Sequence, residues 1–271
     1  MKIQHNPVFW TIGKDGNKLE RNLENEMQEK VFTLPAYYNG ENGIDDINYM
    51  YFENFRLFEL YDSNGSDYER YGCKIEEGDT VVDIGGNIGM FSRRALERGA
   101  SRVITFEPMS KAFSCLVDNV GYDVECYNIA IGKKTCLVNM CVPGDKSLGG
   151  STTITEFNLR ESNYFDPSRN QEIHYTENAI SMSLGELWDL GLLPSRINFL
   201  KIDCEGGEKE IIESLSDDHL SRIDKISMEY HASLLGNELR EEFGQRAISL
   251  GFQSFTLFHG DGSLSQLHLW K

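Results

Sequence analysis

A strand-like run that leads directly into a glycine-rich turn constrains this chain more than any other feature. Residues 80–84 (TVVDI) are mostly β-branched, the turn at 85–89 is GGNIG, and a helix is predicted from about Ile88 to Gly99. The same alternation continues from residue 72 onward. Further strands are expected at 102–106, 124–127, 197–203 and 225–230, and further helices at 110–120 (with Ser110 as N-cap), 184–190, 207–215 and 238–250. This alternation is typical of an α/β fold with a mainly parallel sheet.

The two ends of the chain depart from this alternation. Residues 252–258 and 264–270 flank an Asp-Gly turn and predict an antiparallel hairpin at the end of the sheet. We expect residues 1–70 to be an appendage to a main domain at 71–271, because 13 of the 30 aromatic residues lie within the first 71 positions. These rings are expected to pack against the main domain or to line an acceptor site.

One internal stretch has little periodicity. Residues 143–180 are rich in turn-forming residues and are expected to be a loop insertion or lid. Gly149 and Gly150 could act as a hinge, and the hydroxyl side chains at 151–153 could contact a substrate.

Charge and cysteine content narrow the functional classes. The chain has 26 Lys and Arg against 43 Asp and Glu, a net charge of −17 at pH 7, so nucleic acid is not an expected partner. The six cysteines have no zinc-site spacing, and the sequence has neither a long apolar run nor a signal-peptide pattern. We therefore expect a cytoplasmic protein without a membrane span. The densest basic cluster is expected to be a solvated helix face, formed by Arg93, Arg94, Arg98 and Arg102.

The residues that follow the first two strands indicate a ligand with a ribose. Ligands of open α/β sheets bind outside the carboxyl ends of the strands. Taking Gly85 as the first glycine of a dinucleotide fingerprint puts Asn87 and Met90 at the other two glycine positions, so a nicotinamide cofactor is not expected. Asp83 before the turn would favour a ligand with a positively charged group. Glu107 lies 22 residues after Gly85, the spacing of an acidic residue that binds a ribose diol.

Four segments together resemble the FkbM family of S-adenosylmethionine-dependent methyltransferases. They are VVDIGGNIG at 81–89, TFEP at 105–108, FLKIDCEGGE at 199–208 and ISMEYH at 226–231. The resemblance covers roughly residues 70–271. It implies a Rossmann-like class I methyltransferase fold with a mainly parallel seven-stranded sheet, and O-methylation of hydroxyl groups on sugars or polyketide natural products.

The resemblance also implies a cofactor site on these segments. The methionine moiety of S-adenosylmethionine would lie against the glycine turn, at Asp83, Gly85, Gly86, Asn87 and Gly89. Gly86 replaces an alanine that is more usual in the family, a change that the backbone should tolerate. Glu107 would bind the ribose. The adenine would be bordered by Asn128, Ile129 and Ala130, after the third strand.

The third and fourth strand ends are expected to carry the reaction. Lys201 and Asp203 are two positions apart on one strand, so their side chains leave the same face, and Glu205 follows in the next loop. Glu229 and His231 repeat that spacing on the neighbouring strand. A hydroxyl acceptor needs a proton acceptor within reach, and both Asp203 and His231 are candidates. Because Lys201 would keep Asp203 charged, His231 is slightly preferred, with Lys201 and Glu205 positioning the acceptor.

Alternatives stay open at each level. Asp203, Glu205 and Glu208 could hold a divalent cation, although no metal is assigned, and Cys204 between them is expected to fill the core. The expected reaction is methylation of a small-molecule or glycan hydroxyl, first of a sugar and second of a polyketide or other natural product. The alternatives from other classes are a nucleotide-sugar oxidoreductase, which the glycine spacing disfavours, and a cofactor-binding protein without catalysis.

Overall fold

The computed structural model describes residues 68–143, 173–259, 262 and 264–271, together with the backbone of three strands near the N-terminus. Those three strands are β1 (Phe9–Ile12), β2 (Lys18–Asn22) and β3 (Val31–Thr33), and they form a small antiparallel sheet. No helix of the described residues is both long and apolar enough to cross a membrane.

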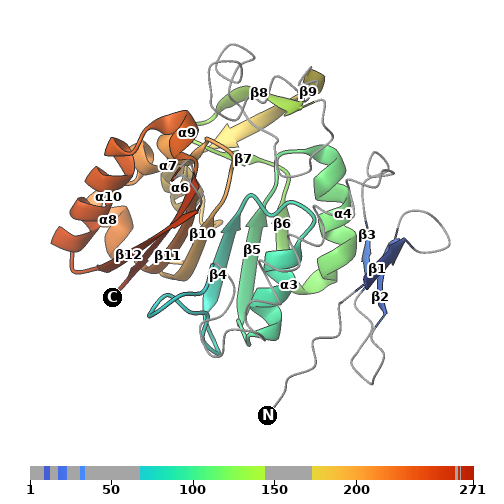
Figure 1. Cartoon of the computed structure of the whole chain (residues 1–271), viewed down its shortest axis with the longest axis horizontal. Coiled ribbons are helices and arrows are strands. Elements are labelled where there is room, and N and C mark those ends of the chain that lie inside the picture. Colours follow the sequence, from blue (N-terminus) through green and yellow to red (C-terminus); the bar gives the residue numbers. More distant parts are fainter. Residues whose placement is uncertain are drawn as a thin grey trace.

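A seven-stranded sheet forms the centre of the main domain (Figure 1). Its strands are β4 (Thr80–Ile84), β5 (Arg102–Phe106), β6 (Glu125–Tyr127), β10 (Ile197–Ile202), β11 (Ile223–Tyr230), β12 (Gln253–His259) and β13 (Leu264–Trp270). They are arranged in the order β12-β13-β11-β10-β4-β5-β6. The strands from β11 to β6 are parallel, whereas β13 is antiparallel to both β11 and β12. The expected mainly parallel sheet with a C-terminal antiparallel hairpin is therefore confirmed.

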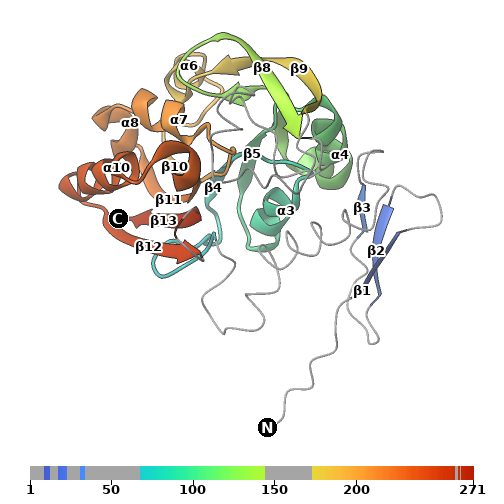
Figure 2. The same cartoon turned by 45° about the horizontal axis from the view of Figure 1, so that its top comes forward.

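Helices cover both faces of this sheet (Figure 2). They are α3 (Met90–Glu97), α4 (Ser110–Val120), α6 (Leu184–Asp189), α7 (Glu208–Ser214), α8 (Asp217–Ser221), α9 (Ala232–Leu235) and α10 (Glu238–Ser249). Apolar residues of α3 and α4, such as Phe91 and Leu116, pack with Val81 and Val103 from one face of the sheet. Residues of α6, α7 and α10 pack on alternate strand positions in a second cluster, with Val82, Ile84 and Leu200. The two clusters lie on opposite faces because successive strand side chains point in opposite directions.

Part of the expected loop insertion is a strand. A third sheet has the order β7-β9-β8, with β7 at Ala130–Ile131, β8 at Cys136–Pro143 and β9 at Ile173–Met182. The prediction of a loop was thus wrong for residues 173–180, which belong to β9 and pair antiparallel with β8 over most of their length. The inward positions of β9 carry small residues, Ala179 and Ser181, so the strand lacks the apolar alternation that identifies most strands. The expected hinge and hydroxyl residues at 149–153 lie outside the described residues.

Helix α4 begins at Ser110 rather than after it. Met109 occupies the N-cap position, without a side-chain cap, so the prediction of Ser110 as N-cap was wrong. The backbone N–H and the hydroxyl of Ser110 instead donate to Glu177 of β9, at 2.7 and 2.8 Å. A carboxylate from the third sheet therefore satisfies the helix N-terminus, an interaction that local sequence does not reveal.

The predicted basic cluster is partly buried, at Arg94. Glu69 is fully buried and its carboxylate lies 3.2 Å from Nε of Arg94 and 3.1 Å from Nε of Arg98. Arg94 itself is only 7% exposed, so the expectation of solvation was wrong for this residue. Arg102 pairs with Glu125 of β6 at 2.6 Å, on the surface. Arg94 is buried because the segment before the main domain brings Glu69 against α3.

Candidate active site

The site lies where the strand order reverses, between β4 and β10. Chain connections lead from β4 to β5 on one side and from β10 to β11 on the other, which is the usual ligand position in such sheets. Gly85 has φ +78°, and a Cβ on it would lie 1.7 Å from the carbonyl oxygen of Asp203. The loop after β4 therefore packs directly on the end of β10, and only glycine fits at this point.

The glycine turn presents its backbone toward Glu107. The N–H groups of Gly85 and Gly86 both donate to the Phe106 carbonyl at 3.0 Å. Asn87 adopts φ +48°, and its N–H donates to Glu107 Oε2 at 2.8 Å. A Cβ on Gly86 would lie 2.1 Å from Oγ1 of the buried Thr105. The Thr105 side chain thus occupies the space that the methyl group of the more usual alanine would need at position 86. Gly89, at φ +88°, is the N-cap residue of α3.

Glu107 is a buried carboxyl group at the end of β5. Its other oxygen, Oε1, accepts the N–H of Met109 at 2.8 Å. Burial raises the pKa of Glu107 to about 7, although the two N–H donors and Lys201 oppose that shift. Asn128 lies beside Glu107, and its amide donates to the carbonyl oxygens of Glu107 (2.8 Å) and Pro108 (3.0 Å). The structure places the remaining two predicted adenine-side residues nearby: Ile129 packs against the core and Ala130 begins β7.

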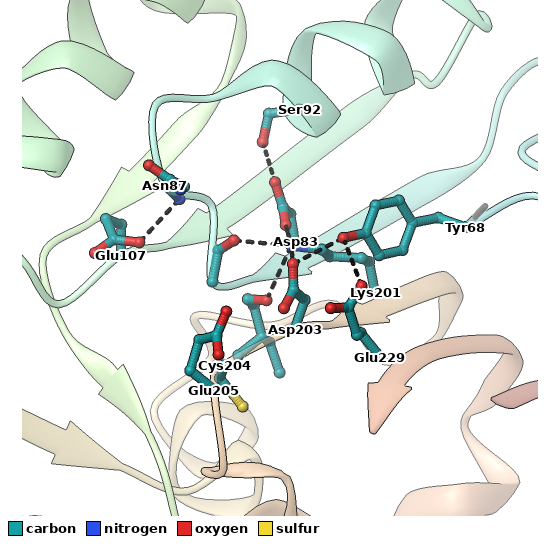
Figure 3. Close-up of polar contacts among 12 residues, drawn as sticks. Tyr68, Asp83, Asn87, Ser92, Glu107, Lys201, Asp203, Cys204, Glu205 and Glu229 are labelled. Carbon is teal, nitrogen blue, oxygen red and sulfur yellow. Dashed lines mark hydrogen bonds and ion pairs between the residues drawn. The ribbon is translucent and has the colours of Figure 1, made fainter. Parts of the chain in front are cut away.

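Asp83 does not contribute an open negative charge. Its side chain is fully buried, with Oδ1 3.3 Å from Lys201 Nζ and Oδ2 accepting the Ser92 hydroxyl at 2.7 Å (Figure 3). The interpretation that Asp83 attracts a positively charged ligand is therefore revised, because the Lys201 ammonium compensates its charge. Any attraction for a cationic group must come from carboxylates farther along the site.

Lys201 connects the glycine turn to Asp203. Its Nζ donates to the Gly85 carbonyl at 2.8 Å and lies 3.3 Å from both Asp83 and Asp203. Burial by itself would lower the pKa of Lys201, but the carboxylates of Asp83 and Asp203 raise it above its ordinary value. Lys201 is thus a permanent ammonium group, and the expected pairing with Asp203 on one face is confirmed.

Tyr68 is a site residue that sequence reasoning did not single out. Its hydroxyl donates to Asp203 Oδ2 at 2.8 Å and lies 3.5 Å from Glu229 Oε2. The ring is buried edge-on against Phe91 at 5.4 Å between centroids. The excess of aromatic residues before the main domain was the available signal, and at Tyr68 both expectations apply, since the ring packs on the domain and its hydroxyl reaches the site.

Glu229 and His231 continue this polar group along the end of β11. Glu229 Oε2 accepts the amide of Gln266 at 2.7 Å, and its Oε1 lies 3.7 Å from His231 Nε2. His231 is fully buried, with Nε2 3.2 Å from Glu205 and Nδ1 3.1 Å from Glu208. Burial alone would lower the pKa of His231, but these two carboxylates raise it well above the ordinary value. This geometry favours an imidazolium ion, which argues against the preference for His231 as proton acceptor.

Two acidic residues after β10, Glu205 and Glu208, contact His231 from opposite sides. Glu208 is fully buried, accepts the N–H of Gly206 at 3.0 Å, and holds the far side of His231. Glu205 has φ +49° in the same turn, which directs its carboxylate to the other imidazole nitrogen. Asp203, Glu205 and His231 do offer ligand atoms within 4.8 Å of one another. Both imidazole nitrogens of His231 already contact carboxylates, those of Glu205 and Glu208, and no metal is assigned to these residues.

Cys204 lies between these acidic residues. Its side chain packs partly buried against the core, and burial raises the pKa of its thiol well above the ordinary value. A thiol in this state is a poor nucleophile. The position therefore agrees with the expected packing role.

Comparison with known proteins identifies the family. Residues 83–252 match the methyltransferase FkbM domain. Methyltransferase 1 of Beauveria bassiana is 27% identical over 161 residues, covering 55% of this chain and 63% of that protein. The 31-O-demethyl-FK506 methyltransferase FkbM of Streptomyces tacrolimicus is 27% identical over 190 residues, covering 60% of this chain and 70% of that protein. The aligned part thus spans just under two thirds of the first relative.

The similarity to solved structures is more distant. The precorrin-6y C5,15-methyltransferase of Geobacter metallireducens is 13% identical, with a TM-score of 0.39 over 74% of this chain and 84% of that one. The ribosomal protein L11 methylase of Lactobacillus delbrueckii is 10% identical, with a TM-score of 0.38 over 72% and 71%. The family assignment rests on the domain match instead, which covers well over half of the 271 residues. The chain belongs to the FkbM methyltransferase family.

Proposed function

We propose that this chain is an S-adenosylmethionine-dependent O-methyltransferase that acts on a hydroxyl group of a small molecule or glycan. The observation that carries the proposal is the position of Lys201, whose Nζ lies 3.3 Å from Asp83 behind the glycine turn and 3.3 Å from Asp203 at the next strand end. One ammonium group thus fixes the cofactor loop and the proton acceptor relative to each other. Such alignment is the main requirement of an in-line displacement.

The residues of the cofactor side fit S-adenosylmethionine. Glu107 is a buried acid beside a turn whose glycine cannot carry a Cβ, and it would hold the ribose. The turn at 85–89 would hold the methionine moiety, and residues 128–130 would border the adenine. When bound, the cofactor supplies an electrophilic methyl group on a sulfonium.

Asp203 is the proton acceptor in this proposal. Its side chain is 23% exposed, whereas the side chains of Lys201 and His231 are at most 4% exposed, so an acceptor hydroxyl can reach it. Lys201 and Tyr68 both contact Oδ2, which orients the carboxylate and leaves Oδ1 for the acceptor. Glu205, 21% exposed, would position the acceptor from the other side.

The exposed carboxylates of the site and the name of one relative support two acceptor classes. Asp203 and Glu205 offer exposed carboxylate oxygens, which suit the many hydroxyl groups of a sugar. A polyketide hydroxyl is the second candidate, because one relative is named a 31-O-demethyl-FK506 methyltransferase. Residues 71–271 form the methyltransferase unit in this proposal, and 1–70 the appendage. The net charge of −17 speaks against a nucleic acid acceptor.

Calorimetric titration tests the cofactor assignment. We expect S-adenosylmethionine to bind the wild-type chain and NAD not to bind, with binding weakened at least about tenfold in Glu107→Gln, a loss of about 1.4 kcal/mol. Glu213→Gln is the matched control, since Glu213 lies on the outer surface of α7, paired with Lys133. Binding of NAD, or of neither compound, would contradict the proposal. Release of S-adenosylhomocysteine with methyl glycosides and macrolide alcohols then separates the two acceptor classes.

A further inference from the structure

A chain of polar side chains leads away from Asp203 into the protein. We propose that the Tyr68 hydroxyl links Asp203 to Glu229, and that Glu229 holds the proton released by the acceptor hydroxyl until the product leaves. This inference rests on the proposed function, because it assigns the fate of the proton in methyl transfer. Neither Tyr68 nor Gln266, which contacts Glu229, lies within the family match at 83–252, so the match alone does not include this link.

The geometry allows one hydroxyl to serve both carboxylates. The Tyr68 oxygen lies 2.8 Å from Asp203 Oδ2 and 3.5 Å from Glu229 Oε2 (Figure 3). Phe91 packs against the ring and holds it in place. Rotation of the hydroxyl about the phenolic C–O bond redirects its proton from Asp203 to Glu229 without moving the ring.

Glu229 is suited to hold a proton. Burial and the charge of Asp203 raise the pKa of Glu229 to about 8, despite the opposing effects of His231 and Lys201. The polar groups that face it come from every neighbouring element, namely Tyr68, Lys201, Asp203, Glu205, His231 and Gln266. The amide of Gln266 fixes Oε2 in the direction of Tyr68.

The other acidic and basic groups are less suited to this role. Glu205 and Glu208 contact the two nitrogens of His231 at 3.2 and 3.1 Å, an arrangement that favours its protonated form. Asp203 is ion-paired with Lys201 at 3.3 Å and is exposed enough to meet the acceptor. Asp203 is thus the first contact of the acceptor, and Glu229, which is buried and linked to Asp203 through the Tyr68 hydroxyl, is where the proton comes to rest.

The proton balance of the step is closed. The acceptor O–H bond breaks as the new O–C bond forms, and the electron pair of the methyl–sulfur bond stays on sulfur. The acceptor proton passes to Asp203. The Tyr68 hydroxyl then turns from Oδ2 of Asp203 to Glu229 and gives its proton there, and the Tyr68 oxygen takes the proton of Asp203 once that carboxyl group presents it on Oδ2. Water takes the proton from Glu229 after the product leaves. Because Glu229 must be ionised at the start, turnover should rise with pH through its pKa.

Two variants with matched controls test the link. Tyr68→Phe removes the bridging hydroxyl and Glu229→Gln removes the proton store. Tyr122→Phe, at a fully exposed residue, and Glu213→Gln are the controls. The carboxyl signals of ¹³C-glutamate-labelled protein are titrated first, which needs no acceptor. Release of S-adenosylhomocysteine is then measured with methyl glycosides and macrolide alcohols from about pH 6 to about pH 10.

We expect one glutamate signal with a midpoint near 8 in the wild type, absent in Glu229→Gln. Turnover should rise through the same midpoint, and both variants should lose that rise and turn over at least about tenfold more slowly at high pH. Affinity for S-adenosylmethionine should stay within about twofold. A purely structural role would lower turnover equally at every pH and keep the inflection, which would overturn the proposal.

Two further results also decide the matter. If the wild type binds no S-adenosylmethionine, the proposed function fails and this inference falls with it. If the cofactor binds and both variants keep the wild-type pH profile, the inference alone is wrong. Loss of turnover on chelation, restored by Mn²⁺, would place a cation where the proton is assigned and would contradict the inference too.

Discussion

Tyr68 and Asp203 are 135 positions apart in the chain, yet the Tyr68 hydroxyl lies 2.8 Å from Asp203 Oδ2. The segment before the main domain therefore completes the candidate site. Its next residue, Glu69, is buried between Arg94 and Arg98 of α3 and anchors the segment there. Packing of this segment and polar contacts within the site are thus coupled.

Removing the charge of Glu69 should affect both stability and the site. Glu69→Gln removes the buried carboxylate that pairs with Arg94, and breaking such a buried pair typically costs about 3 kcal/mol in the free energy of unfolding. Glu125→Gln breaks the surface pair with Arg102 and should cost less than about 1 kcal/mol. Urea unfolding of both variants measures the difference. Equal effects would mean that Glu69 does not anchor the segment.

Gly85 should tolerate no side chain. Gly85→Ala puts a Cβ 1.7 Å from the Asp203 carbonyl, so we expect loss of cofactor binding as well as lower stability. Gly78 also has a positive φ, +90°, but nothing lies within 4 Å of a Cβ there. Gly78→Ala therefore measures the cost of a side chain at positive φ without a steric clash, about 1 to 2 kcal/mol in the free energy of unfolding. Cofactor titration of the two variants should separate them, and unchanged binding by Gly85→Ala would contradict the packing of the turn.

The buried carboxyl of Glu229 should make stability depend on pH. Its pKa of about 8 in the folded chain lies above the ordinary value of 4.5, so the folded state keeps a proton that the unfolded state releases. The resulting stability is present below the ordinary pKa and is lost as pH rises toward 8, at up to about 1.4 kcal/mol per pH unit. Glu229→Gln should flatten this decline in urea unfolding between acidic and alkaline buffers. A decline as steep as that of the wild type would contradict the assignment.

The start of α6 is stabilised by a capping box. Ser183 Oγ accepts the N–H of Glu186 at 3.2 Å, and Glu186 Oε2 accepts the N–H of Ser183 at 2.8 Å. Ser183→Ala should lower the free energy of unfolding by about 1 kcal/mol and leave cofactor affinity unchanged. Thermal unfolding measures the loss of stability, and cofactor titration measures the affinity. A change in affinity would show that α6 also supports the site.

The sequence predicted best those elements that are determined locally. The bounds of β4, β5 and α4 agree with the predictions, because central parallel strands are continuous apolar runs and their turns contain glycine. The proximity of Lys201 to Asp203 also follows from spacing alone. Strand β9 was missed because small residues, Ala179 and Ser181, face inward.

What the sequence could not predict depends on contacts between distant segments. Tyr68 and Glu69 reach the main domain through packing that no local pattern encodes. The surroundings of His231 could not be predicted either, since Glu208 belongs to a helix that follows another strand. The ion pair between Asp83 and Lys201 could not be predicted either. Because Lys201 compensates the charge of Asp83, the expected attraction of Asp83 for a cationic ligand was revised.

The most direct test of the account is methyl transfer by Asp203→Asn. Release of S-adenosylhomocysteine is measured with wild-type and variant chains on methyl glycosides and macrolide alcohols, after calorimetry has shown equal cofactor binding. The account predicts that the wild type methylates an acceptor of one of these classes and that Asp203→Asn is at least about a hundredfold slower. Near wild-type turnover by the variant would contradict the central role of Asp203.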